Sequence, residues 1–385
     1  MDNEIFAINV ASRVGYGIMI IAIPYYMTSN LGLVGVVLAT YPIAEALASI
    51  PVGLIVNRFR VSSLVSIGLL IMATSSLLFA INSNWVILAV LHGLMGVAAA
   101  MIIVPLLTAV TRRRVRLGLG YGGFFSTYFA GYIIGIGIGG LMQGIIEHGF
   151  EAARLSIVTA AAIFLAALPL ALTLKGHRGP GIMAKSLGLR SVELIPLPLW
   201  LGLMILLGVA FTLPGGLTMH LNIGGGFVAL IYVSAALVLA LGILMFGSLV
   251  DRVGAIKVMV IGLVGLSVVI GVAYLVVSGL LSIYYAIAPL APSMFLTSAL
   301  VPSIYAYVGH RAEEGSEGLI MGIYNIPTAA GIAIGNLIGG FSLSRLGLDL
   351  TIILAALTLV IAVALTAVMW IALRGRGVSL NRQST

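Results

Sequence analysis

The sequence predicts an all-α membrane protein in which twelve transmembrane helices form two pseudo-symmetric six-helix bundles, with both termini in the cytoplasm. Three observations predict this class: the composition, the number of apolar runs and the distribution of basic residues. Of the 385 residues, 61% are hydrophobic and only 8% are charged, and the mean hydropathy is +1.22. Soluble domains carry about a quarter charged residues, so we expect this chain in a lipid bilayer.

The apolar runs supply the helices. A helix needs about 20 largely apolar residues to cross a bilayer. The start of the chain lacks the basic segment and cleavage site of a signal peptide, so the first run is expected to be retained. The twelve predicted spans are 5–27, 31–56, 61–82, 85–110, 117–146, 152–174, 194–219, 226–250, 255–278, 281–308, 318–344 and 350–373.

The basic residues fix the orientation. Apart from Arg13, which lies within a span, only Arg154 and Arg345 fall on one side; every other Lys and Arg lies in the alternate loops or the tails. Because loops rich in Lys and Arg stay in the cytoplasm, both termini are predicted there. A multi-pass protein of the plasma membrane is expected, and the net charge of +8 needs no nucleic-acid partner.

The longest interruption divides six spans from six. The segment "KGHRGPGIMAKSLGLR" is polar and basic, which predicts bundles at 1–174 and 194–385 joined by a cytoplasmic linker at 175–193. No extramembrane segment is long enough for a soluble core. Function must therefore reside within the helices.

The two halves contain an internal repeat. Gly53 and Asn57-Arg58 recur as Gly247 and Asp251-Arg252, and "GGFFSTYFAGYIIGIGIGG" recurs as "GIYNIPTAAGIAIGNLIGG". Glycines four residues apart let neighbouring membrane helices pack closely. The predicted packing glycines are Gly122, Gly131, Gly135, Gly139 and Gly140 in one copy and Gly322, Gly331, Gly335, Gly339 and Gly340 in the other.

Together these features resemble the major facilitator superfamily of secondary transporters. The resemblance covers essentially the whole chain and rests on two six-helix halves, the G-x3-D-R-x-G-x-x-K motif and the repeated glycines. It implies a central cavity lined mainly by helices 1, 4, 7 and 10, with two bundles that rock to expose it alternately. This chain departs from the family at Asn57 and Arg60, where Asp and Gly are usual. Ile136 and Asn336 also replace the proline of the exporter version.

Charges near the helix ends predict a cytoplasmic gate. The resemblance implies that Asp251 meets the segment 111–116 and that the loop carrying Asn57 meets the acidic start of the eleventh helix. The alternative is that these charges only set topology in solvated loops, where an exposed pair contributes about 0 to 1 kcal/mol. The predicted gate residues are Asn57, Arg58, Arg60, Arg112, Arg113, Arg114, Asp251, Arg252, Lys257, Glu313, Glu314 and Glu317.

Two charged residues lie deep in predicted spans. At 1.5 Å per residue, Arg13 and Glu45 lie roughly 12 and 16 Å from the same side, so they are predicted to pair. A carboxyl at this depth can take up and release a proton, which makes Glu45 the candidate coupling site. A fixed structural pair is the alternative, and Arg13 can instead hold an anionic substrate.

The remaining cavity candidates share helix faces. Asn9, Arg13 and Tyr16 follow the i, i+4, i+7 spacing, and His92 is either a relay or a packing residue. Few charges are available, so a mainly apolar cavity for amphipathic or lipophilic substrates is expected. The predicted lining residues are Asn9, Tyr16, Ile20, His92, Trp200, Met204, Phe211, Tyr285, Ser293 and Thr297.

The sequence contains no convincing motif of an enzyme or of a cofactor-binding site. "GLGYGG" and "GIGIGG" satisfy G-x-G-x-x-G but lie in an apolar helix without a preceding strand, and no P-loop or clustered His and carboxylate set occurs. We therefore expect a non-enzyme without cofactor or metal, and without cysteine chemistry because the chain has no cysteine.

The function predicted is a monomeric, proton-coupled secondary transporter that exports small hydrophobic or amphipathic compounds. An uptake symporter or uniporter for a small organic anion, centred on Arg13, is the alternative within transport. A membrane sensor or lipid scramblase that kept the fold is the alternative of another class.

Overall fold

The computed structural model describes residues 3–27, 31–145, 149–174, 194–221 and 225–375. This described part contains helices and no strands, so the all-α prediction is confirmed. The linker predicted at 175–193 and the end of the C-terminal tail lie outside it. The helices are α1 (Asn3–Tyr26), α2 (Leu31–Ile55), α3 (Val61–Phe79), α4 (Trp85–Arg112), α5 (Leu117–Ile145), α6 (Gly149–Thr173), α7 (Leu197–Leu221), α8 (Gly225–Val253), α9 (Ala255–Val277), α10 (Ile283–Thr297), α11 (Leu300–Gly309) and α12 (Glu317–Gly375).

Ten helical stretches of the described residues are long and apolar enough to cross a membrane, and Leu197–Leu213 is a shorter apolar helix. The chain is therefore an integral, multi-pass membrane protein. The count of twelve spans and the cytoplasmic position of the termini stay predictions.

Two helices depart from simple spans. α10 and α11 belong to one apolar stretch, Ile283–Gly309, that breaks at Ser298 and Ala299. Pro302 has no N–H to donate to the carbonyl four residues earlier, at Ser298, which explains the break there. α12 consists of two helices that meet at Gly347, where φ is 83° and the backbone is not helical.

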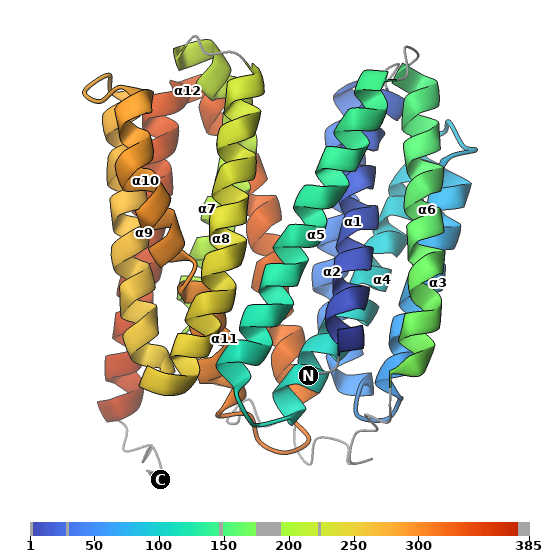
Figure 1. Ribbon diagram of the computed structural model, residues 1–385, viewed down its shortest axis with the longest axis horizontal. Helices are drawn as coiled ribbons and strands as arrows, with labels where there is room; N and C mark the ends of the chain where they lie inside the picture. Colours follow the sequence, from blue (N-terminus) through green and yellow to red (C-terminus); the bar gives the residue numbers. More distant parts are fainter. Residues whose placement is uncertain (1–2, 28–30, 146–148, 175–193, 222–224, 376–385) are drawn as a thin grey trace.

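The helices form two groups, α1 to α6 and α7 to α12 (Figure 1). α2 contacts α12 and α5 contacts α8 across the boundary between the groups. α5 and α8 lie close together at the end of the molecule where α1 begins and α12 ends, and they diverge toward the opposite end (Figure 1). We call the first end the terminal end.

Glycines in the two halves make equivalent contacts within each group. A Cβ at Gly17 would lie 3.1 Å from the Cα of Gly135, and a Cβ at Gly208 would lie 2.8 Å from the Cα of Gly335. These pairs join α1 to α5 and α7 to α12. Because no side chain fits between the backbones, the glycines set the distance between these helices.

A second set of glycines joins the halves. A Cβ at Gly122 would lie 3.0 Å from the Cα of Gly247, and one at Gly322 would lie 3.5 Å from the Cα of Gly53. These are equivalent contacts of α5 with α8 and of α12 with α2. The boundary between the halves therefore closes at the terminal end, backbone against backbone.

Two predicted packing glycines are exceptions. A Cβ at Gly140 or at Gly340 would meet no atom within 4 Å. Each follows a contacting glycine, Gly139 or Gly339, by one residue, which places it about 100° around the helix on an exposed face. The packing prediction is therefore wrong for this pair and describes the other eight.

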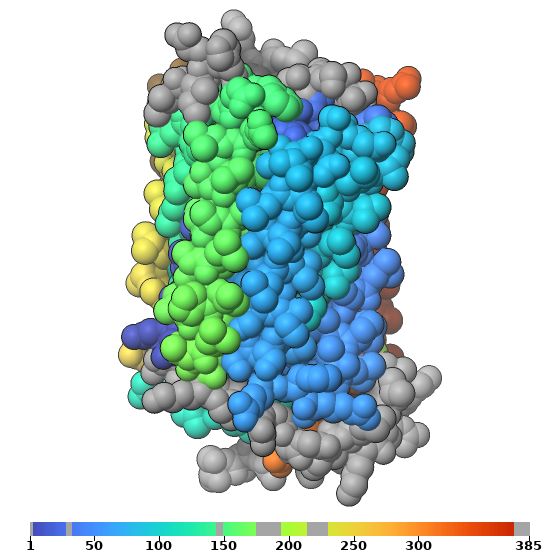
Figure 2. All heavy atoms as spheres, turned by 90° about the vertical axis from the view of Figure 1, so that its right-hand side faces the viewer, coloured from blue at the N-terminus to red at the C-terminus, as the bar shows by residue number. Residues whose placement is uncertain are grey.

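The outer surface of the first half is apolar. α3 and α6 lie side by side on the face shown in Figure 2. Leu70, Leu77, Leu165 and Leu172 of these helices are exposed in the structure. In a bilayer these side chains contact lipid, which removes their exposed area from water.

Candidate functional site

Arg13 lies in a cage of tyrosine rings inside the first half. Its side chain is fully buried, and its guanidinium carbon lies 4.8 Å from the ring centroid of Tyr128, 5.8 Å from that of Tyr132 and 6.0 Å from that of Tyr16. Nη1 also donates to the hydroxyl of Tyr41 at 3.5 Å. We call these five residues the Arg13 cage. Desolvated cations are attracted to aromatic faces, which stabilises the charge.

Within the part of the chain that the structure describes, no carboxylate pairs with Arg13. Its Nε and Nη2 atoms are buried without a hydrogen-bond partner, and no ion pair with Glu45 is present. The predicted pairing is therefore wrong for this conformation. The reason lies on α2, where Tyr41, four residues before Glu45, contacts Arg13 and stacks on Tyr16 with centroids 3.9 Å apart.

Glu45 instead contacts the other half of the molecule. Its side chain is 4% exposed, and Nδ2 of Asn325 on α12 donates to its Oε1 at 3.0 Å. The same amide donates to Oγ of Ser49 at 3.0 Å. A buried, titratable carboxyl thus lies directly at the boundary between the halves.

His92 and Asn9 complete the polar interior of the first half. His92 Nδ1 lies 2.9 Å from the carbonyl oxygen of Val37, and its Nε2 is buried without a partner. Asn9 donates to the carbonyl of Phe124 at 2.7 Å and to Oγ1 of Thr127 at 3.0 Å. Asn9 therefore ties α1 to α5, whereas His92 keeps one nitrogen available for a proton or a ligand.

Aromatic residues from both halves fill the space toward the terminal end. Phe125 of α5 lies 6.1 Å from Trp200 of α7 and 4.6 Å from Tyr305 of α11, and Tyr121 lies 5.4 Å from Tyr305, between ring centroids. We call these four residues the aromatic junction. All four are buried, so the junction is a region of packed side chains shared by the two halves.

The other predicted lining residues are less concentrated. Met204 is buried against Gly331, and Ile20 packs partly buried against the core. Phe211 and Tyr285 are 53% and 76% exposed. The hydroxyls of Ser293 and Thr297 donate to carbonyls of α10 itself, those of Pro289 and Ser293. The structure does not bring these residues together with the Arg13 cage.

The predicted gate lies at the terminal end, with partners that differ from the prediction. Asp251 accepts from the backbone N–H of Gly118 at 2.7 Å and of Leu119 at 2.9 Å. These are first-turn amides of α5, so the carboxylate of one half caps a helix of the other half. The expected partner, the basic segment 111–116, ends just before that turn.

The equivalent contact in the first half uses an amide. Asn57 donates to the carbonyl of Gly315 at 2.5 Å and accepts from Nη2 of Arg112 at 2.6 Å. Arg114 donates to the carbonyl of Ala312 at 2.8 Å and forms an ion pair with Glu317 at 3.0 Å. The acidic start of α12 therefore meets the loop before α5.

Several predicted gate residues take no part in these contacts. Arg58, Arg60, Glu313 and Glu314 are exposed and, among the described residues, their side chains form no ion pair or hydrogen bond. The loop meets the acidic segment at the predicted place, but through Asn57 and the Gly315 carbonyl. The predicted pairing of Arg58 and Arg60 with the glutamates is wrong. Arg114 occupies that place because its loop reaches Glu317. Arg252 and Lys257 are also exposed.

A single family model matches nearly the whole chain. The model of the Major Facilitator Superfamily matches residues 5–217 and 199–384. The chain belongs to the Major Facilitator Superfamily. The resemblance found in the sequence is thus confirmed, and the family and fold are those of transporters rather than enzymes.

Known relatives agree with this assignment. The chain is 24% identical to multidrug resistance protein 2 of Bacillus subtilis (strain 168) over 95% of this chain and 94% of that protein. The structure of the human organic anion transporter MFSD10 is similar with a TM-score of 0.75 and 13% identity, covering 95% of this chain and 98% of that chain. The E. coli fucose:proton symporter has a TM-score of 0.71 at 13% identity, covering 95% and 97%. At such identities the structures show the fold alone.

Sequence reasoning missed Tyr41, Tyr128, Tyr132, Ser49 and Asn325. A signal was present for the tyrosines: Tyr41 lies one turn before Glu45, and Tyr128 and Tyr132 lie one turn apart. Asn325 had only its polarity within an apolar run to mark it. Its contact with Glu45 depends on how two helices meet and cannot be read from local spacing.

Proposed function

We propose that this protein is a proton-coupled secondary transporter that exports small hydrophobic or amphipathic compounds by alternating access. The observation that carries the proposal is the buried hydrogen bond between Glu45 of one half and Asn325 of the other. The multidrug resistance name of the Bacillus relative supports export of such compounds.

The coupling follows from the position of Glu45. An ionised Glu45 accepts a strong hydrogen bond from Asn325, which favours the arrangement closed at the terminal end. Protonation removes the charge and weakens that bond, which lowers the barrier to separating the halves there. A proton taken up from one side and released to the other would thus be tied to the rocking of the bundles.

The orientation fits this cycle. If the terminal end is cytoplasmic, as the basic loops predict, the conformation described is closed to the cytoplasm. The aromatic junction and the Asp251 and Asn57 contacts would then form the inner gate. The apolar aromatic surroundings of the Arg13 cage favour substrates with large apolar surfaces.

Transport in proteoliposomes tests the proposal. Protein reconstituted with a pH gradient should move lipophilic dyes such as ethidium against their gradient and move protons with them. Glu45→Gln keeps the shape and a hydrogen-bond acceptor but cannot change charge, so proton movement should disappear. Glu151→Gln, an exposed carboxyl on α6, is the matched control. Dye-driven proton movement that survives Glu45→Gln would refute the coupling role.

A second candidate is transport of a small organic anion centred on Arg13. The buried guanidinium has two donors without partners and no carboxylate neighbour within ion-pair distance, so it offers a strong site for a carboxylate or sulfonate. The organic anion transporter among the similar structures fits this alternative. Anion uptake that requires Arg13 and persists in Glu45→Gln would favour it over proton-coupled export.

A further inference from the structure

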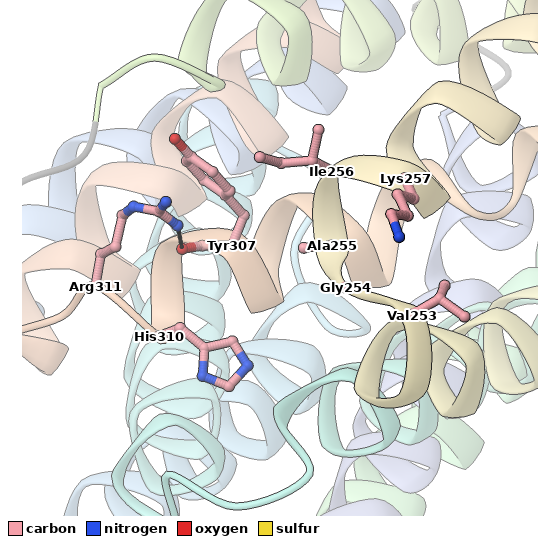
Figure 3. Close-up of a pocket in the computed structure, with 8 residues that line it drawn as sticks. All are labelled: Val253, Gly254, Ala255, Ile256, Lys257, Tyr307, His310 and Arg311. Carbon is pink, nitrogen blue, oxygen red and sulfur yellow. Dashed lines mark hydrogen bonds between the residues drawn. The ribbon is translucent and has the colours of Figure 1, made fainter. Parts of the chain in front are cut away.

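A pocket opens at the terminal end, between the start of α9 and the end of α11 (Figure 3). Its volume is about 320 Å³. The segment from Val253 to Lys257 forms one side, and His310 and Arg311 lie on the other (Figure 3). None of its lining residues belongs to the Arg13 cage or the aromatic junction. We call it the α9–α11 pocket.

The side chains of the pocket are basic. Lys257, His310 and Arg311 line it, and no acidic residue does. The guanidinium of Arg311 is fixed in place, because it stacks 3.7 Å from the ring centroid of Tyr307 and donates to the Tyr307 carbonyl at 3.2 Å. A fixed guanidinium loses little conformational entropy when it binds an anion.

Asp251, the carboxylate that acts on His310, is bound outside the pocket. Asp251 precedes the lining segment, but its two oxygens accept from the amides of Gly118 and Leu119. Burial lowers the pKa of His310, and the charge of Arg311 acts in the same direction against the opposing effect of Asp251. Near neutral pH its ring is therefore uncharged and offers a hydrogen-bond donor beside the Lys257 and Arg311 charges.

The backbone adds to the same preference. α9 begins after Gly254, whose φ is 94°, and no side chain caps its first turn. The first backbone bond into this turn comes from Val258 to the Gly254 carbonyl. The 23-residue helix therefore presents the positive end of its dipole in the wall of a pocket that already holds two cations.

The surroundings of the pocket are apolar. Val253, Ile256 and Val260, on or beside its α9 wall, are 40%, 47% and 54% exposed. A ligand that fills both environments has an anionic head and apolar chains. In a membrane protein, basic pockets at the ends of helices suit the phosphate groups of lipids.

We infer that the α9–α11 pocket binds the phosphate-bearing headgroup of an anionic phospholipid. Lys257, His310, Arg311 and the first turn of α9 hold the phosphate, and the acyl chains cover the exposed apolar residues of α9. The pocket is continuous in sequence with Asp251, so bound lipid also steadies the turn that carries the gate carboxylate.

Lipid binding to the purified full chain tests this inference. Native mass spectrometry from a neutral detergent should show phosphatidylglycerol retained in preference to phosphatidylcholine. Lys257→Gln and Arg311→Gln should each weaken retention of phosphatidylglycerol roughly fivefold. Arg252→Gln is the matched control. Arg252 is an exposed basic residue next to Val253 at the edge of the lining segment, but it does not line the pocket.

The controls separate the outcomes. Lys257 is exposed, so Lys257→Gln keeps the test valid if the Arg311 variant fails to fold. Equal retention of both lipids, or equal retention by Lys257→Gln and Arg252→Gln, would overturn the inference. A rise in unfolding temperature with inorganic phosphate but not with phosphatidylglycerol would show a site for a free anion, and the lipid assignment would be wrong.

Discussion

The two halves of the molecule share a backbone frame but differ in the chemistry they bury. Asn9 donates to the Phe124 carbonyl and to Thr127, and in the equivalent place Trp200 donates to the Tyr324 carbonyl and to Thr328. Asn9 therefore joins α1 to α5, and Trp200 joins α7 to α12 in the same way. The two halves therefore make equivalent hydrogen bonds and glycine contacts between helices, although the donating side chains differ.

The difference is greatest beside the shared glycines. Arg13 packs on Gly131 in the first half, and Met204 packs on Gly331 in the second. Among the described residues, the first half buries a cation and a histidine and the second half buries neither. Both halves bury tyrosines and one glutamate, which is Glu45 in the first half and Glu317 in the second. The deep charges Arg13 and Glu45 therefore belong to the first half, and Asn325 links the second half to them through its hydrogen bond to Glu45.

The largest effect should come from the shared frame itself. Gly247→Val places a side chain against the backbone of α5 at Gly118 and Gly122, so the terminal end cannot close. In a Phe125→Cys background, the label-accessible fraction from that side should rise roughly tenfold or more as the population shifts. The chain has no other cysteine, so labelling with an impermeant maleimide measures the change directly.

Gly140→Val is the matched control for this experiment. A Cβ there meets nothing within 4 Å, so its labelling should equal that of the background. Gly53→Val should reproduce the Gly247→Val result because it disrupts the equivalent contact with α12. Closure in either variant would show that the glycines do not set the contact between the halves.

Replacing Arg13 with methionine, the residue at the equivalent position of the second half, should affect stability and transport differently. Arg13→Met installs the residue of the second half and removes a buried charge that has no carboxylate partner. The free energy of unfolding should stay equal or rise by roughly 1 to 3 kcal/mol, while transport is lost. Thermal unfolding in detergent and flux in proteoliposomes measure the two quantities, and a marked loss of stability would contradict the reading of Arg13 as a functional residue.

An intermediate effect is expected at the gate. Asp251→Ala removes the acceptor of two first-turn amides of α5, which should cost about 0.5 to 2 kcal/mol of local stability. Hydrogen exchange at Gly118 and Leu119 should accelerate in proportion. Asn57→Ala serves as the equivalent change in the first half and should leave these two amides unaffected.

The smallest effect concerns the ion pair at the terminal end. The Arg114 side chain is 44% exposed, so Arg114→Gln should lower the free energy of unfolding by no more than about 1 kcal/mol. Arg58→Gln, at an exposed side chain without a contact, should change nothing measurable. A larger loss for Arg58→Gln than for Arg114→Gln would reverse the assignment of the gate partners.

The close contacts between helix backbones could be predicted from the sequence, because they depend on short, repeated glycine patterns. The glycine ladder, Gly53 and Gly247 mark backbone contacts that only glycine permits, and the structure places them in equivalent pairs. Their partners could not be derived, because the contact of Gly122 with Gly247 joins the two halves. The sequence also did not show that Gly140 and Gly340 lie on an exposed face, one residue beyond the glycines that make the contact.

The site was less accessible. Arg13 and Glu45 stand out as charges in apolar runs, and depth alone predicted that they pair. Tyr41 and Glu45 share one face of α2 and lie one turn apart, about 6 Å along the helix. Tyr41 is the residue that reaches Arg13, and Glu45 meets Asn325. A depth counted from predicted span ends is not accurate to one helical turn, so the sequence located the two charges and misassigned their contact.

The break between α10 and α11 divides one span into segments of unequal protection. All ten residues of α11 are buried, whereas only Ala286 and Ser293 of α10 are. α11 is packed on all sides by neighbouring helices, whereas most side chains of α10 are not covered by protein. In a bilayer the exposed side chains of α10 contact lipid, whereas α11 is packed against protein. In detergent, deuterium should therefore enter α10 sooner than α11, and the single span should behave as two units of local unfolding.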